Sequence, residues 1–176
     1  MDADAYLASQ AAYGSEQHHE QLLHKGYQVD RTLSTRNIRT YTKKGNTIVA
    51  LRGTHLPNLS DLEADKDIVL GTTRTNPQFM QAEYITKKAK QKYGTVLVTG
   101  HSLGGTKAIH AANKVGAKAI VFNPGTGINP LFTGNHTVYR KNKDFISART
   151  RGKNIRVSAG GHSLSDFEPM FSRRWK

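Results

Sequence analysis

The hydrophobic positions along the chain follow two periods, one typical of strands and one typical of helices. Short apolar runs rich in β-branched residues predict strands, which lie at 27–29, 37–42, 47–51, 95–99, 118–123, 136–140 and 154–159. Longer segments repeat apolar residues every three or four positions and predict amphipathic helices, at 3–24, 59–70, 77–93 and 103–115. Strands that alternate with helices predict an α/β fold: a mostly parallel central sheet with helices on both faces.

Turn and capping residues support these boundaries. Lys44, Gly45 and Asn46 read as a turn between two strands. Pro77 suits the first position of a helix, and Gly94 ends that helix. Since neither a repeat nor a linker rich in Pro, Gly or Ser divides the chain, we expect residues 1–176 to form a single domain.

Charge and composition narrow the class of protein. The 176 residues include 26 Lys and Arg against 13 Asp and Glu, a net charge of +13 that favours polyanionic partners. Without cysteine, disulfides and thiolate chemistry are excluded. We find neither a signal-peptide pattern nor an apolar run long enough to span a membrane, so we expect an intracellular or virus-associated protein.

The stretch from Thr95 to Gly116 carries the strongest chemical signal. It runs from an apolar strand into Gly100-His101-Ser102-Leu103-Gly104 and then into a helix. A nucleophilic serine at such a turn needs glycine two residues before and two after, because strand and helix approach closely there. The context therefore predicts Ser102 as a nucleophile, with Gly100, His101 and Gly104 completing the nucleophile elbow. A tight turn with an incidental serine is the plainer alternative.

The same stretch nearly spells a phosphate-binding loop. In that motif a lysine directly follows the last glycine and precedes a hydroxyl residue. Here Thr106 follows Gly105, and Lys107 comes one residue late. The order disfavours nucleotide binding.

A serine nucleophile needs a histidine base and an orienting acid, which follow it in this order: serine, acid, histidine. Three histidines follow Ser102. His110 lies two turns along the helix, and His136 would begin a strand at the wrong end of the sheet. His162 comes just after the last expected strand, so we predict it to be the base, with a surface loop histidine as the alternative.

The acid must lie between Ser102 and His162. Asp144 stands in "RKNKDFIS", at the end of an expected strand, whereas Asp166 and Glu168 come after the histidine. We predict that Asp144 orients the imidazole; an ordinary ion pair with nearby lysines is the alternative. Two oxyanion donors are expected: the N–H of Leu103, directly after the nucleophile, and Thr54, just past the strand "IVAL".

Four motifs together resemble the class-three lipase family, the fungal triacylglycerol lipase type of α/β-hydrolase. They are "IVALRGT", "VTGHSLGG", "NKDFIS" and "GGHS", and the resemblance spans residues 46–167. Leu51 departs from the family's usual phenylalanine. The resemblance implies a compact α/β-hydrolase fold and hydrolysis of carboxylic esters, usually lipids, without metal or organic cofactor.

We therefore expect a lipase, phospholipase or esterase that forms an acyl-enzyme on a Ser-Asp-His triad. The basic surface suggests peripheral docking on anionic membranes, and no specific nucleic acid is expected as a partner. Two alternatives are a non-catalytic basic scaffold that binds nucleic acid, and a peptidase or acyltransferase on the same triad. A metal site at His18, His19, Glu20 and His24 is disfavoured by spacing.

Apolar residues follow several of the expected strand ends. They could line an acyl pocket or belong to the core, and they are Leu56, Leu59, Leu131, Phe132, Phe167, Met170 and Phe171.

Overall fold

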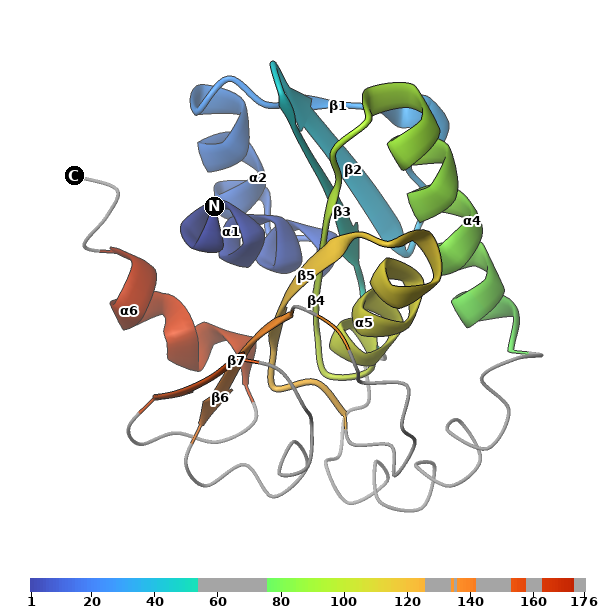
Figure 1. The fold of residues 1–176 in the computed structure, drawn as a ribbon. Helices are drawn as coiled ribbons and strands as arrows, with labels where there is room; N and C mark the ends of the chain where they lie inside the picture. Colours follow the sequence, from blue (N-terminus) through green and yellow to red (C-terminus); the bar gives the residue numbers. More distant parts are fainter. Residues whose placement is uncertain (54–75, 126–133, 135, 142–152, 158–162, 173–176) are drawn as a thin grey trace.

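In the computed structural model, the described residues are 1–53, 76–125, 134, 136–141, 153–157 and 163–172. Within them, seven strands form one sheet in the order β1 to β7 (Figure 1). The strands are β1 (Gln28–Val29), β2 (Ile38–Lys43), β3 (Asn46–Leu51), β4 (Leu97–His101), β5 (Lys118–Phe122), β6 (Thr137–Lys141) and β7 (Lys153–Val157).

The first two strand pairings are antiparallel, and β3 through β7 run parallel. The helices are α1 (Asp2–Ala12), α2 (Glu16–His24), α4 (Pro77–Tyr93), α5 (Leu103–Val115) and α6 (Glu168–Ser172), with short 3-10 helices η1 (Arg31–Leu33) and η3 (Leu164–Phe167). The predicted mostly parallel α/β sheet is confirmed.

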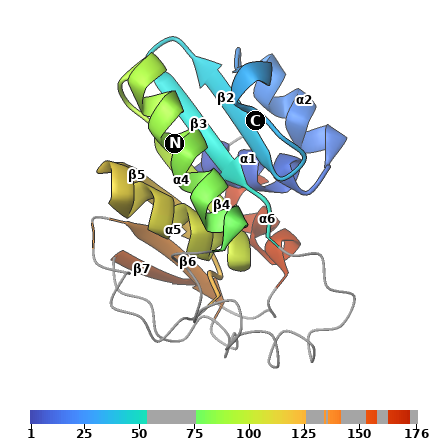
Figure 2. The same cartoon turned by 90° about the vertical axis from the view of Figure 1, so that its right-hand side faces the viewer.

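Helices cover both faces of the sheet, as predicted. Figures 1 and 2 show α1, α2 and α6 on one face and α4 and α5 on the other. Alternate residues of β3 separate the two cores: Ile48 and Ala50 pack toward α1, whereas Val49 and Leu51 pack toward α4 and α5. This is the period of two that a strand buried on both faces must show.

The expected helix at 3–24 is wrong in one respect, because it is two helices. Gly14 has φ 97°, a conformation that closes α1, and Ser15 is the N-cap residue of α2. Residues from both helices, such as Tyr6 and Leu22, are buried in the same core cluster. The apolar pattern therefore continues across the break and hides it.

Two elements lie at the C-terminal end, where the sequence predicted none. Leu164 and Phe167 of η3 and Phe171 of α6 are buried in the core on the α1 face. For Phe167 and Phe171 the core interpretation is therefore confirmed over an acyl pocket, while Met170 is partly exposed. The expected helix at 59–70 and residues Leu56, Leu59, Leu131 and Phe132 lie outside the described residues.

Candidate active site

Ser102 stands at a sharp turn between β4 and α5, as the motif predicted. Its backbone has φ 53° and ψ −128°; Asn123 is the other described non-glycine residue with positive φ. Such a sparsely populated conformation persists only where neighbouring structure holds it. The Ser102 N–H donates to the Phe122 carbonyl at 3.2 Å, and its own carbonyl accepts from the N–H groups of Thr106 and Gly125, both at 3.1 Å.

The two glycines of the motif lie where backbone segments touch. A Cβ on Gly100 would lie 2.5 Å from the Gly104 carbonyl carbon and 2.7 Å from the Leu51 carbonyl oxygen. A Cβ on Gly104 would lie 2.7 Å from the Gly53 nitrogen and closer still to the Leu51 oxygen. Atoms at these distances overlap, so the turn can form only with glycine at both positions.

His101 is fixed by the break between α1 and α2. Its Nδ1 lies 3.2 Å from the Tyr13 hydroxyl, which also donates to the His101 carbonyl at 3.3 Å. Burial raises the pKa of Tyr13 to about 12, so the hydroxyl stays protonated and able to donate. A Cβ on Gly53 would clash with this hydroxyl. Tyr13 thus joins the elbow to the segment after β3, a contact that no local motif predicts.

Leu103 opens α5 directly after the serine. The first N–H groups of a helix have no partner within that helix, and they lie at its positive end. Since α5 spans 13 residues, its N-terminus presents a full helix dipole beside Ser102. This geometry suits an oxyanion donor at the Leu103 N–H.

Lys107 is buried one turn into α5, with 3% of its surface exposed. Its Nζ donates to the Arg52 carbonyl at 2.7 Å and to Gln78 Oε1 at 3.0 Å. Burial lowers the pKa of Lys107 to about 8. The side chain that nearly completed a phosphate-binding motif instead ties α5 to Arg52, two residues before Thr54.

Three predicted site residues, Thr54, Asp144 and His162, lie outside the described residues. The strands that precede them are described and run parallel to β4: β3 before Thr54, β6 before Asp144 and β7 before His162. The carboxyl ends of parallel strands meet at one edge of a sheet, which is the edge where Ser102 follows β4.

The two rejected histidines have structural contacts. His110 is buried in α5, its ring edge-on to Phe79 at 5.3 Å and its Nε2 3.6 Å from Glu83 Oε2. Burial lowers the pKa of His110. His136 precedes β6, accepts the Ala119 N–H at 3.2 Å and lies at the amino end of the strand, away from Ser102.

The N-terminal histidines also have partners. His18 Nδ1 lies 2.6 Å from the Ser15 hydroxyl, and His19 Nδ1 lies 2.8 Å from the Tyr41 hydroxyl. Among the described residues, three or more His, Cys, Asp or Glu side chains never gather as a metal site would require. These contacts account for the histidine-rich helix without a metal.

Comparison with known sequences decides the family. A sequence model described as phospholipase-like, the Tle-like phospholipase domain, matches residues 7–159. The chain belongs to this family. Membership supports a lipid ester hydrolase in general terms. The expected resemblance is therefore confirmed at the level of a lipase- or phospholipase-like α/β-hydrolase, and the family that matches is not the class-three lipase family.

Other comparisons with this phospholipase-like domain are more distant. A search of curated proteins gives no significant match. Among solved structures, an α/β serine hydrolase without a lid from Xanthomonas campestris aligns with a TM-score of 0.42 and 15% identity, over 57% of this chain and 57% of that one. A likeness of this size carries no argument about chemistry.

None of the helices described in this phospholipase-like domain combines the length and the apolar character that a bilayer span requires.

Proposed function

We propose that the protein is a serine hydrolase of lipid carboxylic esters, with Ser102 as nucleophile, His162 as base and Asp144 as the acid that orients it. The observation that carries the proposal is the strained backbone of Ser102 between two obligatory glycines, in a chain of a phospholipase-like family. A turn without catalytic duty gains nothing from such strain, which clusters at functional sites.

The spacing of the sheet is compatible with a triad. Neighbouring strands lie about 4.8 Å apart, so β6 stands about 10 Å and β7 about 14 Å from β4. Asp144 follows the end of β6 by three residues, which reach about 10 Å, and His162 follows the end of β7 by five, which reach about 17 Å. Both chain segments are long enough to approach Ser102.

The residues after His162 give independent support. Ser163 precedes η3, whose Phe167 packs edge-on against Phe122 with ring centroids 5.5 Å apart. Lys141 at the end of β6 donates to the Asp166 carbonyl at 2.5 Å. Since the carbonyl of Phe122 accepts the Ser102 N–H, the chain that follows His162 is anchored beside the strand next to the nucleophile.

In the proposed reaction, His162 accepts the proton of the Ser102 hydroxyl as its oxygen attacks the ester carbonyl. The N–H groups of Leu103 and Thr54 hold the oxyanion, and Asp144 stabilises the imidazolium. The alcohol leaves with the proton from His162, and water activated by the same imidazole then releases the acid from the acyl-enzyme.

The test is labelling with a fluorophosphonate, followed by mapping of the adduct and by turnover of a short-chain nitrophenyl ester. We expect the adduct on Ser102, and a Ser102→Ala variant that folds normally but loses about 10⁴-fold or more in kcat. Ser165→Ala, which removes an exposed hydroxyl bonded to Ser163 at 2.7 Å, is the matched control and should keep its activity. Undiminished turnover by Ser102→Ala would refute the proposal.

A further inference from the structure

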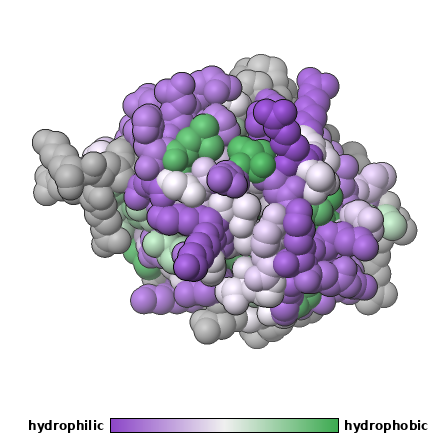
Figure 3. All heavy atoms as spheres, turned by 90° about the horizontal axis from the view of Figure 1, so that it is seen from above, coloured by the Kyte–Doolittle hydropathy of each residue, from purple (hydrophilic) through white to green (hydrophobic). Residues whose placement is uncertain are grey.

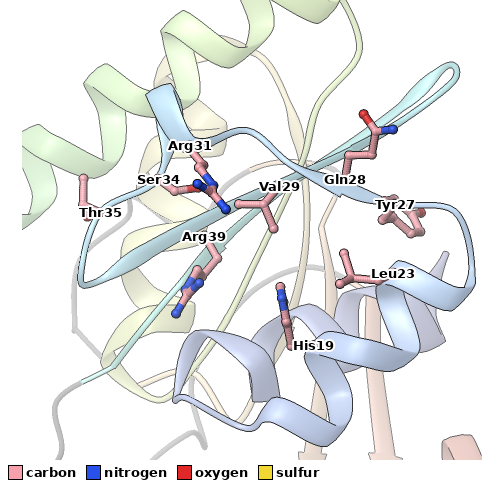
Figure 4. Close-up of a pocket in the computed structure, with 9 residues that line it drawn as sticks. All are labelled: His19, Leu23, Tyr27, Gln28, Val29, Arg31, Ser34, Thr35 and Arg39. Carbon is pink, nitrogen blue, oxygen red and sulfur yellow. The ribbon is translucent and has the colours of Figure 1, made fainter.

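A hollow of about 550 Å³ lies between α2 and the β1–β2 edge of the sheet (Figure 4). Its walls come from three parts of the chain: helix α2, the stretch from Tyr27 through η1, and the start of β2. The proposed triad does not use it. The hollow therefore calls for an explanation of its own.

Two arginines and a histidine enter this hollow from different elements. Figure 4 shows Arg31 from η1, Arg39 from β2 and His19 from α2 around the same space. Among the described residues, neither arginine forms an ion pair with an acidic side chain. Two guanidinium groups that share a hollow without a carboxylate favour an anionic ligand, above all a phosphate, which guanidinium binds bidentately.

The nearest acids do not neutralise the arginines. Asp30 Oδ2 accepts from Lys92 Nζ at 2.8 Å and from the Tyr93 hydroxyl at 2.7 Å, and its Oδ1 accepts from Thr32. Glu16 on α2 is exposed, and its charge acts on the Tyr41 hydroxyl against that of Arg39, without an ion pair to the arginine. The positive potential of the hollow is thus left for a ligand.

The remaining polar groups suit the same ligand. His19 Nδ1 bonds to the Tyr41 hydroxyl at 2.8 Å, which fixes the ring and leaves Nε2 for a ligand. Thr35 Oγ1 accepts the Asn37 N–H at 3.3 Å, and its hydroxyl hydrogen can still be donated. The site therefore holds donors beside its two cations.

Apolar side chains line the rest of the hollow. Leu23, with 42% of its surface exposed, stands beside Val29 and Tyr27. A basic part next to an apolar part matches an amphiphile better than a free anion. In the sheet register Arg39 faces Ala50, near the carboxyl end of β3, so the hollow lies toward the edge that carries Ser102.

We propose that the hollow binds the phosphate headgroup of an anionic phospholipid and so docks the protein on the membrane that presents its substrate. Arg31 and Arg39 hold the phosphate, His19 adds a hydrogen bond, and Leu23 contacts the adjoining glycerol or acyl carbons. The proposal rests on the proposed function for the reason to dock, and on the hollow alone for the docking residues.

The experiment compares Arg31→Gln/Arg39→Gln with the control Lys87→Gln/Lys88→Gln, which removes the same charge from exposed positions on α4. Sedimentation measures binding of the full chain to phosphatidylcholine vesicles with and without phosphatidylglycerol. We expect the arginine variant to lose about 30-fold in affinity for the anionic vesicles, about fivefold for each cation. The control should lose much less, and Arg31→Lys/Arg39→Lys should recover part of the binding.

Further arms separate the other outcomes. Equal losses in both glutamine variants would mean that the net charge of the chain, not the hollow, drives docking, and would overturn the proposal. So would an arginine variant that loses affinity for inorganic phosphate or for a duplex oligonucleotide but still binds vesicles normally. Turnover of the soluble nitrophenyl ester should be unchanged. If that turnover is absent in every protein, the proposed function fails while the vesicle result still stands.

Discussion

At the scale of single residues, the turn at Ser102 is held by neighbours that allow no other side chains. The strained backbone costs on the order of 1–3 kcal/mol, which the hydrogen bonds to Phe122, Thr106 and Gly125 offset. The close approach of β3, β4 and α5 makes those bonds possible, and it depends on glycine at positions 100 and 104.

Gly104→Ala should therefore disrupt the elbow. Its Cβ would meet three backbone atoms, in Leu51, Arg52 and Gly53, that no side-chain rotation can move. We expect the free energy of unfolding to fall by about 3 kcal/mol and ester turnover to be lost. Urea denaturation and a turnover assay measure the two effects. Gly125→Ala, whose Cβ would first meet Thr106 Oγ1 at 3.2 Å, is the milder comparison; equal losses in the two variants would contradict the argument.

Lys107 should make stability depend on alkaline pH. Its pKa is about 8 in the folded chain and 10.5 when unperturbed, so between these values the unfolded chain binds more protons than the folded one. Stability then rises with pH across this window, by up to about 3 kcal/mol, and the gain is absent below it. Lys107→Met lacks the proton and should not show this rise.

The measurement is the difference in free energy of unfolding between wild type and Lys107→Met, followed by urea denaturation across that window. Taking the difference cancels the lysines and tyrosines that both proteins share. A difference that stays constant with pH would show that the buried amine keeps its ordinary pKa.

At the scale of elements, local signals set the helices better than the strands. Helices α4 and α5 begin and end at the predicted residues, because Pro77, Gly94 and Gly116 mark their ends in the sequence itself. Strand β4 was predicted at 95–99 but lies at Leu97–His101, because pairing with β5 continues to His101 opposite Phe122. Strand ends depend on partners that are distant in the chain.

The cap of α4 gives a prediction at this scale. Asn76 Oδ1 accepts the Gln78 N–H at 2.9 Å, directly before Pro77. Asn76→Ala should lower the free energy of unfolding by about 1 kcal/mol, because one helix N–H loses its partner. Asn76→Ser, which restores a capping oxygen, should recover most of the loss in the same denaturation experiment. A serine variant as unstable as the alanine variant would mean that capping is not the cause.

At the scale of the whole molecule, one aromatic cluster joins the two ends of the chain. Tyr6 of α1 stacks on Phe171 of α6 at 5.1 Å, and Phe122 of β5 lies between them and Phe167 of η3. The cluster fixes the C-terminal residues on the sheet beside the nucleophile strand. Outside it, the surface seen in Figure 3 is mostly hydrophilic with scattered apolar residues, as the high charge requires.

Phe167→Ala should therefore affect both stability and turnover. Loss of a fully buried ring costs about 3–5 kcal/mol, and the segment that follows His162 would lose its anchor on Phe122. At a temperature where the variant is folded, we expect kcat for the nitrophenyl ester to fall at least about tenfold. Phe79→Ala removes an equally buried ring from α4, on the other face, and should lower stability alone. Equal losses of kcat in the two variants would argue against the anchor.

The candidate site divides in the same way between local and distant information. Ser102 and its glycines were predictable because the turn lies within five consecutive residues and its sterics are local. The predictions for Thr54, Asp144 and His162 came from chain order, and the parallel strands before them support that order. Tyr13 and Lys107 could not be predicted, because each contacts the elbow region from a place that only packing of the sheet brings near.

The sequence by itself determined the alternation of strands and helices, the elbow and the family, because hydrophobic period, glycine placement and motif order are written in neighbouring residues. The tertiary structure decided the break between α1 and α2, the burial of Lys107 against Arg52 and the gathering of Arg31, Arg39 and His19 in one hollow. The physical reason is that these features depend on which side chains meet across the folded sheet, and such contacts arise only when the whole chain packs.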